Sequence, residues 1–214
     1  MVNSQGQSKR AERRERELAL RRADLIAAAS KAFAERGFSG VQVSEIAEAA
    51  GLSLASVYSM FGGKEDLYQE VITHMAETIQ EGVRKRVDAI PSAHERLLCV
   101  VDSLFACFEE NRGLLRLFAQ GTQGLPWKIR QAMGEVSIQI LHGFTEWVIS
   151  IAEQAKREGQ LQGLDPESVA LAVTGAVSSK AAHWIDTKPD RPLAQASPGV
   201  RALFERLFDE ASAS

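Results

Sequence analysis

Residues 51–68 read GLSLASVYSMFGGKEDLY, and this stretch decides the fold expected of the whole chain. Apolar residues recur at helical spacing on either side of Gly51, over residues 43–50 and 54–61. Gly51 can adopt the positive φ that a tight turn between two helices requires. Ser53 suits a helix N-terminus, because its hydroxyl can accept a hydrogen bond from a free backbone N–H group. The stretch therefore predicts two short helices joined by a tight turn.

A longer helix precedes this pair, and together the three predict a helix-turn-helix unit. Its apolar stripe starts after Arg21, and Gly37 is placed to end it. In such a unit the second helix supports a third, whose outer face enters the major groove of DNA. We expect Leu52 and Val57 to anchor the third helix to the core. The residues left near its exposed N-terminal end are Ser53, Leu54, Ala55, Ser56 and Tyr58.

The rest of the sequence also favours helices, so the predicted fold class is all-α. A long helix over 64–87 carries one apolar stripe. No segment shows the alternating apolar pattern, bounded by tight-turn residues, that predicts a strand. Further helices are expected over about 92–108, 126–157, 165–185 and 198–211, with a short apolar stretch at 114–119.

Composition excludes several classes of protein. Of the 214 residues, 45% are apolar and 25% charged, which is ordinary for a globular chain. Two cysteines cannot form a disulfide framework in a chain of this length. No apolar run approaches the roughly 18 residues of a membrane span, and the charged first twenty residues do not resemble a secretory signal. We therefore expect a cytoplasmic protein without a membrane segment.

The net charge of −3 conceals a basic N-terminal end. Residues 1–64 contain 10 Lys and Arg against 7 Asp and Glu, and the remainder is acidic. Such a segment is typical of a surface that faces phosphates, whereas alternating Arg and Glu also occur in solvent-exposed helices. The excess lies mainly at Lys9, Arg10, Arg13, Arg14, Arg16, Arg21 and Arg22.

Residues 51–68, with AFAERGF at 32–38 and IAEAAG at 46–51 before them, resemble the signature of the TetR/AcrR family of bacterial regulators. The family implies a homodimer on a palindromic double-stranded DNA operator, with one third helix in each half-site. Its motif places Ser44, Ser53, Ala55 and Ser56 near bases and Tyr58 and Lys64 at phosphates. The phosphate role of Lys64 also has support that does not depend on the resemblance. A lysine at a helix start is unfavourable beside the positive end of the helix dipole, and a bound phosphate would offset this cost.

Two positions depart from the family pattern. The family usually has Ser or Thr where Gln42 stands, as the cap of the second helix and a phosphate contact. Gln caps poorly, so this contact is absent or is taken over by Ser44. At Met60 the family often has a residue that can form hydrogen bonds, and methionine is a poor partner for them.

The pattern divides the chain into four parts. Residues 1–20 form a basic, partly disordered arm, and residues 21–63 form the DNA-binding domain. Residues 64–90 form a connecting helix, and residues 91–214 form an effector-binding and dimerisation domain.

The resemblance implies that the C-terminal helices enclose a pocket for a small lipophilic effector. An aromatic set of this kind could equally fill the core of a bundle. Fatty acyl, aromatic and drug-like molecules all fit such a pocket. Its expected lining is Phe105, Phe108, Phe118, Trp127, Phe144 and Trp147, with His142 and His183 as polar groups.

The last two predicted helices suit an interface between two copies of the chain. One is rich in small residues, which let helices approach closely, and the other supplies leucine and phenylalanine. Packing within one chain is the alternative. The expected contacts are Val173, Ala176, Val177, Lys180, Trp184, Leu203 and Leu207.

The sequence contains no catalytic constellation. We find no nucleophile elbow, no phosphate-binding glycine loop and no Cys-x-x-Cys pair. His142 and Glu146 have a spacing that metals can use, but two ligands do not make a site. We therefore predict no enzyme activity, no catalytic residue, no metal and no cofactor.

These observations predict a ligand-responsive transcriptional repressor, a homodimer that a small lipophilic effector releases from its operator. The main alternative is an all-helical small-molecule-binding protein or enzyme whose first 60 residues serve packing only. A third interpretation is that the chain is an interaction module, which uses the basic arm without sequence-specific DNA binding.

Overall fold

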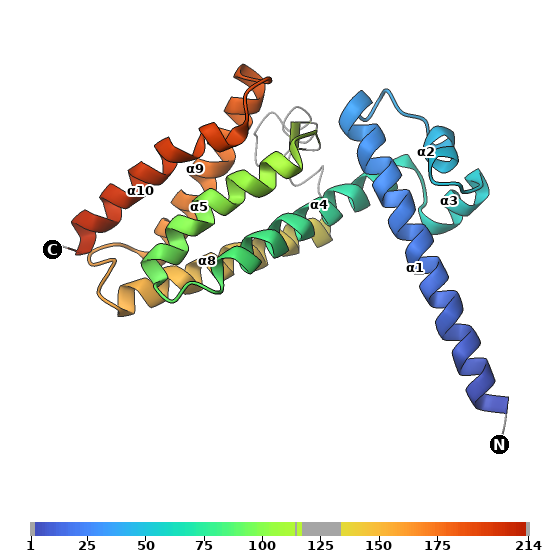
Figure 1. Cartoon of the computed structure of the whole chain (residues 1–214), viewed down its shortest axis with the longest axis horizontal. Coiled ribbons are helices and arrows are strands. Elements are labelled where there is room, and N and C mark those ends of the chain that lie inside the picture. The colour runs from blue at the N-terminus through green and yellow to red at the C-terminus, as the bar shows by residue number, and fades with distance from the viewer. Residues whose placement is uncertain (1–2, 114, 117–133, 213–214) are drawn as a thin grey trace. The chain divides into compact units, whose positions relative to one another are not determined.

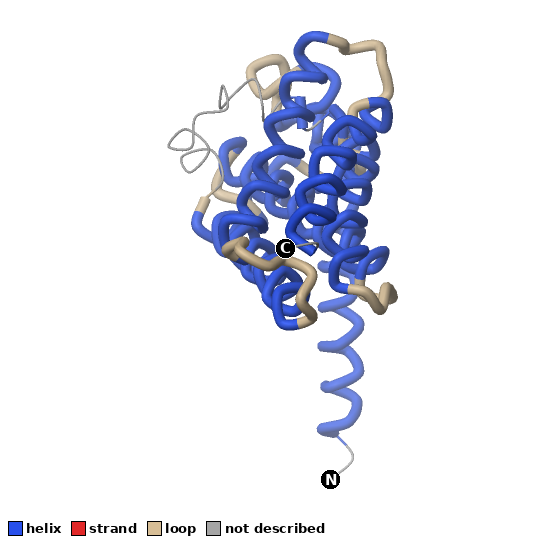
Figure 2. Tube along the Cα trace, turned by 90° about the vertical axis from the view of Figure 1, so that its left-hand side faces the viewer, coloured by secondary structure: helices blue, strands red, loops and turns tan. Residues whose placement is uncertain are grey.

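The computed structural model describes residues 3–113, 115–116 and 134–212 of the chain (Figure 1). Figure 2 shows only helices and connecting loops in this described part, which confirms the predicted all-α fold class. The elements are α1 (Asn3–Arg36), α2 (Val43–Ala49), α3 (Leu54–Met60), α4 (Lys64–Val87), α5 (Ala93–Glu110), α8 (Glu135–Arg157), α9 (Pro166–Thr187), a 3-10 turn η1 (Leu193–Gln195) and α10 (Ser197–Ser212).

The chain forms two compact units, Met1–Val71 and Ile72–Ser214. The boundary between them falls inside α4, so the first two turns of that helix belong to unit 1 and the remainder to unit 2.

Unit 1 has a small core that α1, α2, α3 and the start of α4 share. Phe33 on α1 is fully buried, and its ring lies edge-on to Tyr68 on α4, with 5.5 Å between the ring centroids. Phe38 contacts the same tyrosine at 5.1 Å. Burial raises the pKa of Tyr68. The remaining core residues are Leu25, Ile26, Ala29, Val41, Val43, Ile46, Ala47, Val57, Phe61, Leu67 and Val71.

Unit 2 is built around α5, which contacts α8, α9, α10 and η1. Apolar residues cover most of its circumference, so the helix can be buried on several sides at once. Ser92 caps α5 by accepting from the Glu95 N–H group at 3.4 Å. Asp165 caps α9 in the same way, with 2.8 Å between its Oδ2 atom and the Ser168 nitrogen.

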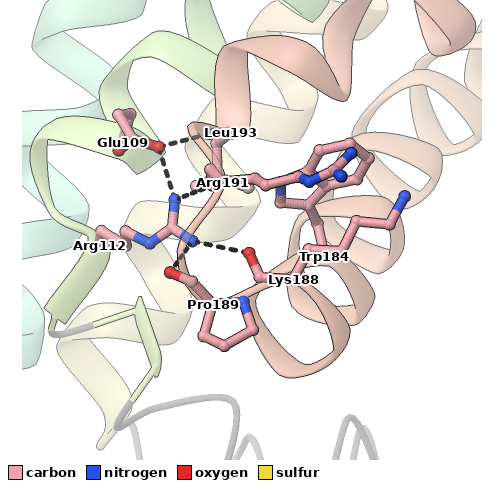
Figure 3. A network of polar contacts seen from close by, with 7 residues as sticks. All are labelled: Glu109, Arg112, Trp184, Lys188, Pro189, Arg191 and Leu193. Carbon is pink, nitrogen blue, oxygen red and sulfur yellow. Dashed lines mark hydrogen bonds and ion pairs between the residues drawn. The ribbon is translucent and has the colours of Figure 1, made fainter.

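A polar network ties the segment before η1 to the end of α5 (Figure 3). The Arg112 guanidinium donates to the backbone oxygens of Arg191 and Pro189, both at 2.7 Å, and to that of Lys188 at 3.3 Å. Glu109 accepts from Arg112 at 3.0 Å and from the Leu193 N–H group at 2.6 Å. Arg112 therefore holds this segment by its main chain.

The helix α4 lies very close to α5 at Gly82. A Cβ atom added to Gly82 would stand 2.9 Å from the Cys107 sulfur, closer than real Cβ contacts allow. Cys107 is buried, and the Arg86 Nη1 atom donates to its sulfur at 2.6 Å. Glycine at position 82 thus lets the two helices approach.

Two helix boundaries differ from the prediction. The helix α1 begins at Asn3, although residues 1–20 were expected to be partly disordered. Residues 8–22 are almost all strong helix formers, which explains how the helix extends past its buried part. The helix α8 begins at Glu135, whereas most of the expected start after Pro126 lies outside the described residues, as does much of the stretch 114–119.

Within the described residues, no helix combines the length and the hydropathy that a bilayer span requires.

Candidate nucleic-acid interface

The turn between α2 and α3 is built by backbone hydrogen bonds around one glycine. Gly51 has φ of 66°, and its N–H group donates to Glu48 O at 3.0 Å. The Leu52 N–H group donates to Ala47 O at 2.8 Å, which completes the common glycine-dependent ending of a helix. The positive φ predicted for Gly51 is confirmed.

The helix α3 has one buried and one exposed face. Val57 is 1% exposed and holds the helix against the core of unit 1, as predicted. Leu54 and Tyr58 are 43% and 51% exposed on the outer face. Ser53 and Ala55 are also exposed, so four of the five side chains expected at the end of this helix face solvent.

The hydroxyl groups at the start of α3 bond to one another. Ser53 Oγ accepts from the Ser56 N–H group at 3.1 Å and lies 2.7 Å from Ser56 Oγ. Ser56 is half-buried as a result, and Ser53 serves as the predicted N-cap. Ser44, near the start of α2, is exposed and has no hydrogen bond through its side chain in the described part of unit 1.

The start of α2 is held by Glu45 instead of by a capping side chain at Gln42. The Glu45 carboxylate accepts from the Gln42 backbone N–H group and from Arg36 Nη1, each at 3.0 Å. The bond from the Gln42 backbone, together with Arg36, lowers the pKa of Glu45. Glu45 therefore supplies the cap that Gln42 was expected to lack.

Lys64 and Tyr58 have different environments. Lys64 is the first residue of α4 and is half-buried, with its Nζ atom 4.6 Å from the centre of the Phe38 ring. That cation–π contact offsets the unfavourable helix dipole, so it gives Lys64 a stabilising role besides the expected one at phosphate. The Tyr58 ring is half exposed and free to reach a ligand.

Of the expected pocket residues, Phe105, Phe108 and Phe144 are buried in unit 2. Trp147 is half-buried, 5.4 Å from the Phe144 ring. The two expected polar groups have a different environment. His142 and His183 are exposed, because their positions fall on the outer faces of α8 and α9. Phe118 and Trp127 lie outside the described residues.

The residues expected at a dimer interface divide into two groups. Leu203 and Leu207 on α10 are 61% and 37% exposed. Val173, Val177 and Trp184 on α9 are buried in the core of their own chain, because the inner face of α9 packs on α5 and α8. Ala176 and Lys180 are half-buried between the two faces. The outward face of α9 instead carries Leu171, Gly175, Ser178, Ser179 and His183.

Comparison with known proteins agrees with this geometry. Residues 25–71 match the family of bacterial regulatory proteins called the tetR family. The chain belongs to the TetR family. It is 24% identical to the transcriptional activator FasR of Mycolicibacterium smegmatis, over 81% of this chain and 75% of FasR. It is 25% identical to the fatty acid metabolism regulator protein of Bacillus subtilis, over 84% of this chain and 91% of that protein.

The fold of TetR-family structures extends beyond the matched residues. The crystal structure of FadR from Bacillus subtilis in complex with stearoyl-CoA superposes with a TM-score of 0.72 at 22% identity, covering 85% of this chain and 96% of FadR. The protein is accordingly a TetR-family transcriptional regulator with an N-terminal helix-turn-helix unit and a C-terminal helical domain.

Sequence reasoning missed one residue of this TetR-family unit. Arg22 was counted only in the basic excess of residues 1–64, yet its guanidinium lies 4.4 Å from the centre of the Phe61 ring, just after α3. It also pairs with Glu70 on α4 at 2.8 Å. The position of Arg22 one turn before the buried Leu25 was the available signal, because residues three apart share a helix face.

Proposed function

We propose that this TetR-family regulator is a homodimeric repressor that binds a palindromic operator in the cytoplasm and is released by a long-chain fatty acyl effector. The observation that carries the proposal is the outer face of α3, where Leu54, Ala55 and Tyr58 are exposed while Val57 fixes the helix to its core. A short helix with small and polar side chains on a solvent-exposed face fits the major groove.

The proposed contacts to DNA are of two kinds, those to base edges and those to phosphates. Ser44, Leu54, Ala55 and Ser56 would lie against base edges, where small side chains permit close approach and hydroxyls can bond to either partner. Tyr58 and Lys64 would bind phosphates, which position the helix without reading sequence. Ser53 would keep its hydroxyl on the Ser56 N–H group and support the helix from its end.

The proposed dimer uses the outward faces of α9 and α10. Leu171 is 52% exposed and Leu203 61% exposed, and Gly175 has no atom within 4 Å of a Cβ built on it. Leucines beside small residues favour close packing against the same surface of a second copy, as twofold symmetry requires. Two such copies would present their α3 helices to successive half-sites, about 34–36 Å apart.

The effector assignment is supported by the relatives. The Bacillus subtilis relative is named a fatty acid metabolism regulator, and FadR of that species was solved with stearoyl-CoA. In this chain, Phe105, Phe108 and Phe144 supply the apolar interior that an acyl chain needs. The acyl group would act by binding one arrangement of unit 2 more tightly than the other, since equal affinity for both would change nothing.

The first test is a selection of bound DNA from genomic fragments, with and without stearoyl-CoA and with free CoA as the control. We expect a palindromic product with half-sites one helical turn apart, and release by stearoyl-CoA but not by CoA. Recovery of DNA without shared sequence would contradict the operator. Retention of DNA at saturating stearoyl-CoA would contradict the effector.

A second test examines the α3 contacts on the selected DNA. Lys64→Gln should weaken binding to every sequence alike and reduce the slope of log affinity against log salt by about one. Lys31→Gln is the matched control, because Lys31 is an exposed α1 cation outside the proposed contacts. Ala55→Arg should instead change the preferred half-site sequence. An unchanged slope for Lys64→Gln would remove Lys64 from the phosphate contacts.

A further inference from the structure

The helix α1 extends far beyond the core that it helps to build. Its first buried side chain is Leu25, and every residue from Ser8 to Arg21 is exposed. At 1.5 Å per residue this exposed part is about 20 Å long. Figure 1 shows it continuing past α2 and α3, the helices of the same unit. A helical extension that buries nothing adds little to stability, so its composition calls for another explanation.

The cations of this extension gather on one side of the helix. Lys9, Arg13 and Arg16 lie within about 60° of one another around the helix axis. A second row, Arg10, Arg14 and Arg21, lies within about 40° and directly beside the first. Glu15 is opposite this band and Glu12 is beyond its edge, whereas Glu17 lies between the two rows and pairs with Arg13. We call the six cations the basic band.

Most of the basic band has no partner in the described chain. Its one ion pair joins Arg13 to Glu17 at 3.0 Å, with both side chains largely exposed. A helix stabilised by its own charges would pair them at i and i+4, yet five cations remain unpaired in the described structure. These five are Lys9, Arg10, Arg14, Arg16 and Arg21.

The base of the extension is fixed beside the end of α3. Arg22 covers the Phe61 ring, which directly follows α3, and it pairs with Glu70. The extension therefore starts within the unit that carries the proposed DNA-binding face, and its direction is set by that unit's own core.

We propose that the basic band binds the phosphates of duplex DNA outside the half-site that α3 contacts. This inference rests on the proposed function, because it assigns a second contact surface to the same complex. It predicts an affinity term that depends on salt and on the length of flanking DNA but not on the sequence of the flanks.

The distribution of apolar residues favours DNA over a membrane or a protein partner. Leu18 and Leu20, the exposed leucines of the extension, point about 160° apart. A helix that lies in a bilayer surface needs its apolar residues on one face, and a protein interface needs an apolar centre. The basic band has neither an apolar face nor an apolar centre, so its charges suit the phosphates of DNA better than either of these partners.

The test compares wild type with the triple variant Arg10→Gln, Arg14→Gln and Arg16→Gln on the DNA recovered by the selection. Each protein is measured on a duplex that ends at the half-sites and on one with ten further base pairs at each end. A matched control, Lys85→Gln, Lys156→Gln and Arg157→Gln, removes the same charge from exposed positions of unit 2.

On the flanked duplex the triple variant should reduce the salt slope by about 2 to 3, since each lost phosphate contact contributes about 0.9. The control should keep the wild-type slope, and the duplex without flanks should not distinguish the proteins. Equal salt slopes for wild type and triple variant on flanked DNA would overturn the proposed role of the basic band. The proposed function would still stand in that case if Lys64→Gln lowers the salt slope.

Two other outcomes would also overturn the proposal. If wild type selects no DNA, the proposed function fails and the basic band fails with it. If the triple variant binds flanked DNA normally but loses binding to vesicles of anionic phospholipid, the band serves a membrane instead. Unfolding of the variants should match wild type, because the substituted side chains are exposed.

Discussion

At the residue scale, the close contact between α4 and α5 at Gly82 reverses the usual preference for alanine over glycine inside a helix. Alanine is normally favoured over glycine inside a helix by about 1 kcal/mol. At Gly82 a methyl group would meet the buried sulfur of Cys107 at 2.9 Å. The space left by the missing side chain is therefore used by the neighbouring helix.

We expect Gly82→Ala to lower the free energy of unfolding by about 1 to 3 kcal/mol, as overpacking does. Gly143→Ala on α8 should raise it by about 0.5 to 1 kcal/mol, because nothing lies within 4 Å of that position. Urea unfolding followed by circular dichroism measures both. Equal stability of the two variants would refute the close contact, whereas adding Cys107→Ala to Gly82→Ala should recover part of the loss.

Glu45 predicts a dependence of stability on pH. Its pKa is lowered in the folded protein, so the carboxylate stabilises the fold above its ordinary pKa, and this stability disappears as the pH falls below about 4.5. Glu45→Gln should therefore be less stable than wild type at pH 7, and this difference should be smaller at pH 3. Urea unfolding at the two pH values tests this. Glu48→Gln, on an exposed position of the same helix, should show no such convergence.

At the element scale, the helices could be predicted where a local signal marks them. Gly51 and Ser53 each define a helix end through a positive φ or a local hydrogen bond, and the structure places both as expected. Ser92 and Asp165 cap helices through similar local bonds, at the starts expected near residues 92 and 165. The start of α1 could not be predicted in this way. Its first turns bury nothing, so no apolar stripe marks them, and only helix propensity acts there.

The segment before η1 depends on a contact that the sequence does not indicate. Arg112 and residues 188–191 are more than 70 positions apart, and the bonds go to backbone oxygens, which every residue has. We expect Arg112→Ala to cost about 1 to 2 kcal/mol, because it removes several hydrogen bonds from a charged donor to exposed backbone oxygens. Arg112→Lys should recover little, since an ammonium group cannot form the same fork.

Proteolysis of the folded protein and urea unfolding measure this effect. Cleavage in residues 188–191 should be faster in both Arg112 variants than in wild type. Arg116→Ala is a nearby control for the loss of a positive charge. If Arg112→Lys were as stable and as resistant as wild type, the forked geometry would not matter.

At the scale of the whole molecule, composition indicates which helices would suit the proposed dimer, but not which of their faces point outward. Small residues surround much of α9, so no single stripe distinguishes its two sides. Which face is buried depends on how α5 and α8 pack against it, and helix periodicity does not fix this. The exposure of His142 on α8 and of His183 on α9 could not be predicted for the same reason.

Substitutions on the proposed interface should separate assembly from folding. Leu171→Glu with Leu203→Glu should convert a dimer to a monomer, because both leucines are more than half exposed in one chain and would be desolvated in a dimer. Analytical ultracentrifugation measures the change, and operator affinity should fall with it. Val136→Glu, at another exposed apolar position, should leave the dimer intact. A persistent dimer in the double variant would exclude this interface.

Arg112 binds main-chain oxygens of the loop between α9 and η1, so these hydrogen bonds do not depend on which side chains the loop carries (Figure 3). Asp190 is exposed in the middle of that loop and forms no ion pair in the described part of the chain. A cysteine at this position could carry a fluorescent dye without disturbing its anchor. Such a label would report directly on how unit 2 responds when an effector is added.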